Sequence, residues 1–233
     1  MFEGFTKETG DFLWELSFNN ERPWFLEHKE QLERCLNRPF KALAQETYAL
    51  LCRRFPDYEG NVHVSRIYRD ARRLFGRGPY KDHLWFSIQT GNHNEGGPCF
   101  WFEISAADFS YGLGFWDERP STLELYRRAV DANPARFERI VKALNREKSL
   151  RLAGREYKKP KGDRGELLNP WYNRRSLVLE HTEDFGGDLL GPELPARLVD
   201  CYAKLMPLYG FLQEVRRTAE AENAPRTEEQ HGS

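Results

Sequence analysis

The sequence predicts an α+β fold, in which one antiparallel sheet of four or more strands packs against helices from both ends of the chain. Residues 6–55 and 194–215 repeat apolar residues at helical spacing, whereas residues 83–116 alternate with a period of two. The connections at 92–97 and 106–108 are short enough for hairpins. Strands that follow one another between helical segments favour an antiparallel sheet over a doubly wound parallel one.

The first quarter of the chain is predicted to be helical. Phe12, Leu13 and Leu16 recur at helix spacing, and a cap-type stretch then leads to Pro23, a residue suited to a first helical turn. A third helix is expected to open at Pro39. The sequence therefore predicts that these helices form one layer of the fold.

The middle of the chain predicts strands with two different faces. One face is apolar and is expected to pack on the helices. The other carries Trp85, Trp101 and Trp116 among small and polar residues, so it is either a groove or a surface covered by another layer, the commoner arrangement for aromatic side chains. The apolar face comprises Leu84, Phe86, Ile88, Phe100, Phe102, Ile104, Phe109, Tyr111, Leu113 and Phe115.

The last part of the chain returns to helices. Ser121 and Glu124 have the spacing of a capping box and predict a helix to about residue 131, and a second helix is expected to begin at Pro134. A short strand at 177–179 and a helix over 194–215, broken at Pro207, follow. We predict a single domain over residues 1–218 and a disordered polar tail over 219–233.

Composition limits the function classes. The 35 basic and 36 acidic residues give a net charge of −1, which excludes a globally basic nucleic-acid binder but allows a local basic patch. The four cysteines and the histidines lack metal-ligand spacing, so we predict no metal, cofactor or disulfide. Apolar runs fall short of the roughly 18 residues that span a membrane, and the first residues lack a signal core. A cytoplasmic protein without a membrane partner is expected.

Two segments concentrate positive charge. Residues 66–81 hold six basic side chains and one acid, Asp70, in an expected strand over 62–70 that runs into a turn formed by Gly76, Gly78 and Pro79. Residues 151–175 hold eight basic side chains and three acids. Crowded cations repel one another unless a carboxylate or a bound anion compensates them. We therefore expect the two segments to converge on one anion site.

The candidate site residues follow from this charge pattern. Guanidinium groups match the oxygens of phosphate and carboxylate, so Arg69, Arg72 and Lys81 are expected to hold an anion while Asp70 orients Arg69 or takes a proton. The structural alternative is that Asp70, helix C-termini, or carboxylates such as Glu27 and Glu103 pair with these cations and fix the loop. No catalytic residue is assigned. The predicted ligand-binding set is Arg66, Arg69, Asp70, Arg72, Arg77, Tyr80, Lys81, Trp85, Trp101, Lys158 and Lys161.

Several motifs together resemble the bacterial domain of unknown function 2461 family, DUF2461, from about residue 5 to residue 212. They include Phe12-Leu13, Asn19-Asn20, Trp24-Phe25, His28-Lys29, Arg66-Ile67-Tyr68-Arg69-Asp70, Pro79-Tyr80-Lys81, Gly154 and Lys158-Lys159-Pro160-Lys161-Gly162. The resemblance implies a fold neighbourhood and a shared site rather than an activity. Members usually carry an acid where this chain has Gly76, so a second loop carboxylate as metal ligand or general base is missing, whereas a cation is kept at Arg77.

Two functional hypotheses remain open at this point. The first is a site for a small molecule that bears a phosphate or carboxylate, with or without catalysis. The second is a non-catalytic interaction module that binds a protein or single-stranded nucleic acid through a basic, aromatic surface. A concave site favours the small ligand, whereas a flat, continuous positive face favours the macromolecule.

Overall fold

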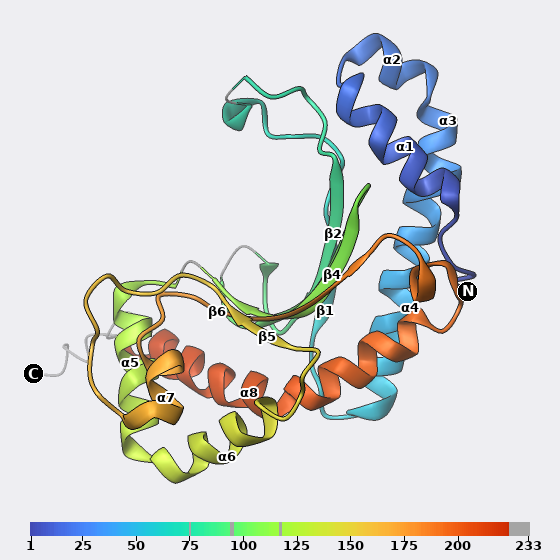
Figure 1. The fold of residues 1–233 in the computed structure, drawn as a ribbon. Coiled ribbons are helices and arrows are strands. Elements are labelled where there is room, and N and C mark those ends of the chain that lie inside the picture. Colours follow the sequence, from blue (N-terminus) through green and yellow to red (C-terminus); the bar gives the residue numbers. More distant parts are fainter. Residues whose placement is uncertain (75, 94–95, 117, 224–233) are drawn as a thin grey trace, which may run out of the picture.

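A six-stranded antiparallel sheet lies at the centre of the computed structural model, which describes residues 1–74, 76–93, 96–116 and 118–223 (Figure 1). Its spatial order is β1-β2-β3-β4-β6-β5. The predicted α+β class and antiparallel sheet are confirmed. The strands are β1 (Asn61–Val64), β2 (His83–Gln89), β3 (Cys99–Ser105), β4 (Asp108–Phe115), β5 (Arg151–Ala153) and β6 (Leu177–Asp184).

Helices precede and follow the strands in the sequence, and two of them, α4 and α8, cross the same face of the sheet (Figure 1). No helix in the described part of the chain is long and apolar enough to cross a membrane. The helical elements are α1 (Lys7–Phe18), α2 (Arg22–Glu27), α3 (Lys29–Leu32), the π-helical turn η1 (Glu33–Asn37), α4 (Arg38–Arg54), the 3₁₀ turn η2 (Ala71–Arg73), α5 (Pro120–Ala132), α6 (Pro134–Leu144), α7 (Gly165–Tyr172), the 3₁₀ turn η4 (Gly187–Leu190) and α8 (Leu194–Asn223).

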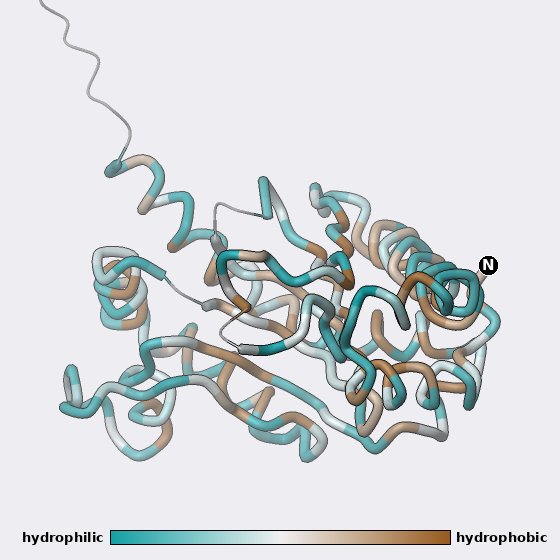
Figure 2. The backbone as a smooth tube through the Cα atoms, turned by 90° about the horizontal axis from the view of Figure 1, so that it is seen from above, coloured by the Kyte–Doolittle hydropathy of each residue, from teal (hydrophilic) through white to brown (hydrophobic). Residues whose placement is uncertain are grey.

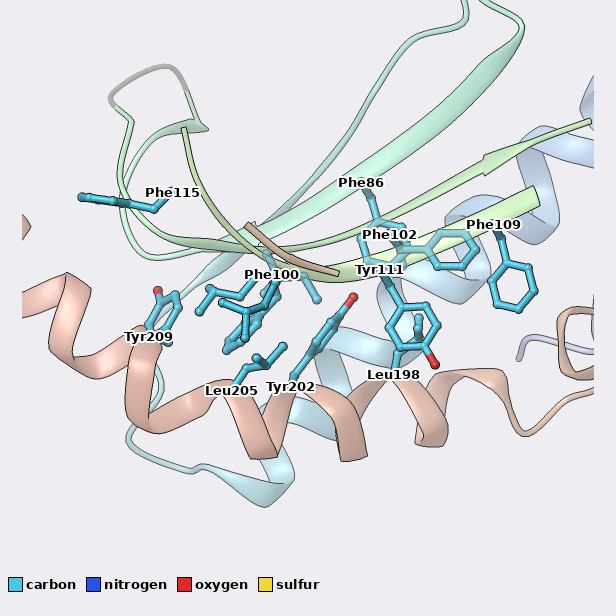
Figure 3. Close-up of a cluster of buried hydrophobic side chains, with 14 of the residues drawn as sticks. Phe86, Phe100, Phe102, Phe109, Tyr111, Phe115, Leu198, Tyr202, Leu205 and Tyr209 are labelled. Carbon is cyan, nitrogen blue, oxygen red and sulfur yellow. The ribbon is translucent and has the colours of Figure 1, made fainter. Parts of the chain in front are cut away.

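The packed face of the sheet forms the centre of the hydrophobic core. Phe100 and Phe102 point from β3 toward the helices and are fully buried (Figure 3). Tyr202 of α8 stacks on Phe100 with ring centroids 4.7 Å apart, and Phe40 of α4 meets Phe102 at 5.9 Å. Hydrophobic residues recur along the strands and the helices, whereas the connecting loops are mostly hydrophilic (Figure 2). The predicted apolar face is therefore the face that carries the fold.

Several predicted boundaries were wrong, among them that of the short strand over 177–179, which extends to Asp184 as β6. α5 begins at Pro120, with Arg119 as N-cap in place of Ser121, because the fixed φ of proline suits the first helical position. α8 continues through Pro207 without the predicted break, since buried residues on both sides, among them Leu205 and Leu208, hold the helix against its neighbours. β1 ends at Val64, and the expected strand to residue 70 is reduced to an isolated bridge between Tyr68 and Tyr80.

The predicted disordered tail begins too early. α8 extends to Asn223, and Ala219 is buried in the core, because the side chains of the last helical turns still contact the domain. The rest of the predicted tail, residues 224–233, lies outside the described residues.

Candidate ligand-binding groove

The second face of the sheet is concave and forms a groove. In Figure 1 the helices α4 and α8 lie on the opposite face, and the connection between β1 and β2 extends over the concave side. The cavity measures about 730 Å³. We call it the groove; its lining includes Trp85, Ser87, Gln89, His93, Cys99, Trp101, Glu103, Trp116, Arg155, Val178 and Glu180.

Strand register explains why these side chains meet. Successive residues of a strand point to opposite faces, so residues paired across strands share a face. Trp85 of β2 pairs with Glu103 of β3, and Trp101 of β3 pairs with both Ser87 and Gly112 of its two neighbouring strands. The same alternation that buries phenylalanines on one face therefore places tryptophans and polar residues on the other.

Glycines in β4 shape the floor of the groove. A Cβ at Gly112 would lie 1.8 Å from the carbonyl oxygen of Leu179, and a Cβ at Gly114 would lie 2.1 Å from the ring of Trp116. Trp116 therefore packs directly over Gly114, with its ring centroid 5.8 Å from that of Trp101. A larger residue at Gly114 would displace this tryptophan, and a larger residue at Gly112 would clash with the backbone of the neighbouring strand β6.

Basic groups surround Trp85 at one end of the groove. His63 and His93 stack in parallel with ring centroids 4.0 Å apart, and they lie 5.4 Å and 5.1 Å from the ring centroid of Trp85. Lys81 places Nζ 5.7 Å from the same ring centroid. We call Arg66, Lys81, His63 and His93 the basic cluster, because the charge of Arg66 also acts on Lys81 and His63.

Electrostatics disfavours the charged forms in the basic cluster. The pKa of Lys81 is lowered by burial and by the positive charges of Arg69 and Arg66, and Glu103 offsets this only in part. The pKa of His63 is lowered by burial, then by its basic neighbours, and burial lowers the pKa of His93. A bound anion would favour the charged forms of all three groups.

Two further polar groups in the groove carry unused hydrogen-bonding capacity. Burial raises the pKa of the half-buried Glu103 carboxyl, to which no described residue donates a hydrogen bond. The indole Nε1 of Trp101 is buried and has no acceptor among the described residues. Glu180, by contrast, forms an ion pair with Arg151. Buried polar groups without partners are uncommon, and such groups in a cavity are typical of a ligand site.

A sequence model described as a conserved hypothetical protein (DUF2461) matches residues 8–211. The chain belongs to the DUF2461 family. The match spans every element of the sheet and all residues named for the groove. No curated protein sequence matches the chain. In this DUF2461 chain Gly76 is exposed and adopts φ of +78°, a conformation that favours glycine.

Several predicted site residues of the 66–81 segment hold the loop itself. The guanidinium of Arg69 donates to the carbonyl of Tyr80 at 2.7 Å and to Asp82 at 3.2 Å. Asp70 accepts hydrogen bonds from the backbone and the guanidinium of Arg72. Tyr80 is buried and stacks on Phe25 at 3.7 Å. These contacts match the structural alternative for the loop.

Other predicted residues of this segment lie differently. Lys81 reaches the Trp85 end of the groove, whereas Arg66 and Arg77 are exposed. Trp85 and Trp101 both line the groove. The structure thus brings Lys81, Trp85 and Trp101 to one place.

Several basic side chains of the 151–175 segment form ion pairs with other residues of the protein. Its Arg155 lines the groove, while Lys158 is exposed and the exposed Lys161 lies over the ring of Tyr157 at 4.7 Å. Lys158 and Lys161 do not belong to the described lining. Ion pairs join Arg151 to Glu180, Arg164 to Asp131, and Arg174 to Glu156.

Sequence reasoning missed several residues at the groove, among them Glu103, His93 and Arg155 of its lining and His63 of the basic cluster. Glu103 had a readable signal, because it lies two residues from Trp101 in an alternating strand and must share its face. His63 lies in a four-residue strand whose register cannot be read from the sequence, and His93 lies in a hairpin connection. Arg155 was counted in the basic segment, but nothing local to its sequence distinguishes it from the neighbouring cations.

Proposed function

We propose that the groove binds a small molecule that carries a phosphate or carboxylate group. The anion would lie beside the basic cluster, and the rest of the ligand would lie along Trp85 and Trp101. The observation that carries this proposal is the position of Lys81, His63 and His93 around the ring of Trp85, which lines the concave site together with His93.

Size supports a small ligand. A cavity of about 730 Å³ falls in the range of small-molecule pockets, which extends over roughly 300–1,000 Å³. Aromatic walls with a few convergent polar groups are also typical of such pockets. The concave shape is the feature that separates this hypothesis from a flat macromolecular surface.

Charge supports an anionic ligand. Lys81 forms no ion pair within the described residues, and burial, followed by the nearby arginines, lowers its pKa. A hydrogen bond to a charged group contributes about 1.5–3 kcal/mol when the partner is well placed. A phosphate or carboxylate beside Lys81 would gain such bonds and would also compensate Arg66.

A binding surface for single-stranded nucleic acid is the second candidate. The observation in its favour is the presence in the groove of Trp85 of β2, Trp101 of β3 and Trp116, which follows β4 and is 38% exposed and able to stack on a base. Glu103 and Glu180 in the same groove weigh against it, because they would face a backbone of phosphates.

Calorimetry and thermal shift with a ligand panel test the proposal. The panel contains nucleotides, sugar phosphates, dicarboxylates and short oligonucleotides. A ligand at 100 times its Kd is expected to stabilise the protein by about 2.7 kcal/mol. Lys81→Met keeps the aliphatic stem over Trp85 but removes the charge, so we expect binding to weaken about tenfold or more and to lose most of its salt dependence.

Lys159→Met is the matched control, because Lys159 is an exposed lysine of the other basic segment. Lys159→Met should bind the anion with the same affinity as the wild type. Equal binding by Lys81→Met and wild type would contradict the proposed site, and stabilisation by oligonucleotides alone would favour the second candidate.

A further inference from the structure

Glu103 occupies the groove beside the proposed anion site, and its position is fixed by strand pairing. It pairs with Trp85 on one side and Ser110 on the other, so its side chain leaves the same face of the sheet as the Trp85 ring. Directly paired residues have Cβ atoms about 4.5–5.5 Å apart. Glu103 therefore lies next to Trp85, whose ring is also approached by Lys81.

From this arrangement we propose that the ligand of the groove carries a hydroxyl group beside its anionic group and that Glu103 accepts the hydrogen bond from that hydroxyl. The ligand class is a sugar phosphate or another hydroxylated acid. This inference rests on the proposed function and specifies its ligand.

The Glu103 carboxyl needs a donor that the protein does not supply. It is half-buried, and no residue in the described ranges donates a hydrogen bond to it. Its pKa is raised mainly by burial, and the nearby carboxylates Asp108 and Asp82 act in the same direction, against His83 and Lys81. A polar group taken out of water without a partner is unfavourable, so a bound ligand that donates to it is favoured.

A bare anion does not meet this need. The charged oxygens of a phosphate or a simple carboxylate are acceptors, and their negative charge would repel Glu103. An ammonium group would suit Glu103 but would be repelled by Lys81 and Arg66, whose charges already lower the pKa of the basic groups around them. A hydroxyl donates without adding charge, and it is therefore the group that fits both neighbours.

Trp85 lies beside both polar groups. Its ring centroid is 5.7 Å from Nζ of Lys81, and its strand position pairs directly with Glu103, so the ring offers an apolar surface next to both. The C–H face of a sugar ring or of a short hydroxylated chain covers such a surface, with its hydroxyls directed to the side. The three groups together thus select a hydroxylated carbon skeleton that carries an anion.

Matched ligand pairs test this inference by calorimetry. Ribose 5-phosphate and glucose 6-phosphate are compared with pentyl and hexyl phosphate, which carry the same charged group but no hydroxyl. We expect the wild type to bind at least one sugar phosphate about fivefold or more tightly than its alkyl partner. Glu103→Met, of similar length and without an acceptor carboxylate, should abolish that preference.

Inorganic phosphate provides a second readout, because its binding should not weaken. Glu103→Met removes a repulsive charge, so phosphate should bind to this variant as tightly as to the wild type or more tightly. Glu103→Gln retains a carbonyl acceptor and should keep part of the preference; it also serves if the Met variant does not fold. Glu180→Gln is the control, because Glu180 lines the same groove but already pairs with Arg151.

The outcomes distinguish a failure of this inference from a failure of the proposed anion site. This inference is overturned if the wild type binds anions in a Lys81-dependent way but shows no preference for sugar phosphates. It is also overturned if Glu103→Met weakens the binding of both ligands of a pair equally. In either case the proposed anion site still stands. If no anion binds the wild type, the proposed function itself fails.

Discussion

The two faces of the sheet are built from the same strands but have opposite properties. On the packed face Phe86, Phe102 and Phe109 are fully buried against one another and against α4 and α8 (Figure 3). On the concave face Trp85 and Trp101 are only half-buried. Aromatic residues therefore serve the core on one face and line a cavity on the other.

This difference indicates a division of tasks. Burial of apolar area on the packed face stabilises the fold. The concave face holds groups whose charged forms are disfavoured, namely Lys81, His63 and Glu103, and such groups are frequent at functional sites. A fold that is stable through one face can keep unfavourable electrostatics on the other.

Truncation of one aromatic residue on each face should give the largest contrast. Phe102→Ala removes a ring that contacts Phe40, Phe86 and Phe109, so it should lower the free energy of unfolding by about 3–5 kcal/mol. Trp85→Ala removes a half-buried ring and should cost less than about 1.5 kcal/mol. Urea denaturation of both variants measures the difference. Similar losses would show that the concave face also carries the fold.

Much of this contrast can be predicted from the sequence. Strict alternation in 83–89 and 99–105 predicts which residues share a face, and both faces have the composition expected. What the sequence does not contain is the curvature of the sheet and the absence of a covering layer among the described elements (Figure 1). These features depend on how α4, α8 and the strands pack together. The sequence alone therefore does not decide whether the tryptophan face is a groove or is covered by another layer.

The site was harder to predict than the fold for a related reason. Charge density in the sequence drew attention to Arg69 and Lys81 as anion ligands and counted Arg164 among the cations of the 151–175 segment, but pairing in the structure separates them. Arg69 meets Asp82 and Arg164 meets Asp131, whereas Lys81 lies over Trp85 without an ion pair among the described residues. Partners this distant in sequence, such as Asp131 for Arg164, follow from tertiary structure alone.

A smaller contrast concerns pH. The folded state lowers the pKa of His63 and His93 below the ordinary value of 6.5, so the unfolded chain binds protons more readily. The contribution of the two imidazoles to the free energy of unfolding is therefore present above about pH 6.5. It is lost as the pH falls from 6.5 toward their lowered folded-state pKa values. The double variant His63→Gln/His93→Gln should therefore lose less stability than the wild type between pH 7.5 and 5.5.

Urea unfolding at several pH values measures this effect, which is expected to be small because both imidazoles are partly exposed. His28→Gln is the control, since His28 stacks on Trp24 away from the groove. A pH dependence that is identical in the wild type and the double variant would show that the stacked pair does not titrate as the groove geometry implies.

The six tryptophans allow the most direct measurement of the central claim, that the concave face is the ligand site. The ¹⁵N–¹H indole signals, assigned by single Trp→Phe variants, are followed while the tightest-binding anion of the panel is added. We predict that the signals of Trp85 and Trp101 shift with one shared Kd, while those of the exposed Trp14 and the buried Trp171 stay in place. Binding by calorimetry that leaves Trp85 and Trp101 unchanged, or that moves Trp14 instead, would contradict the account.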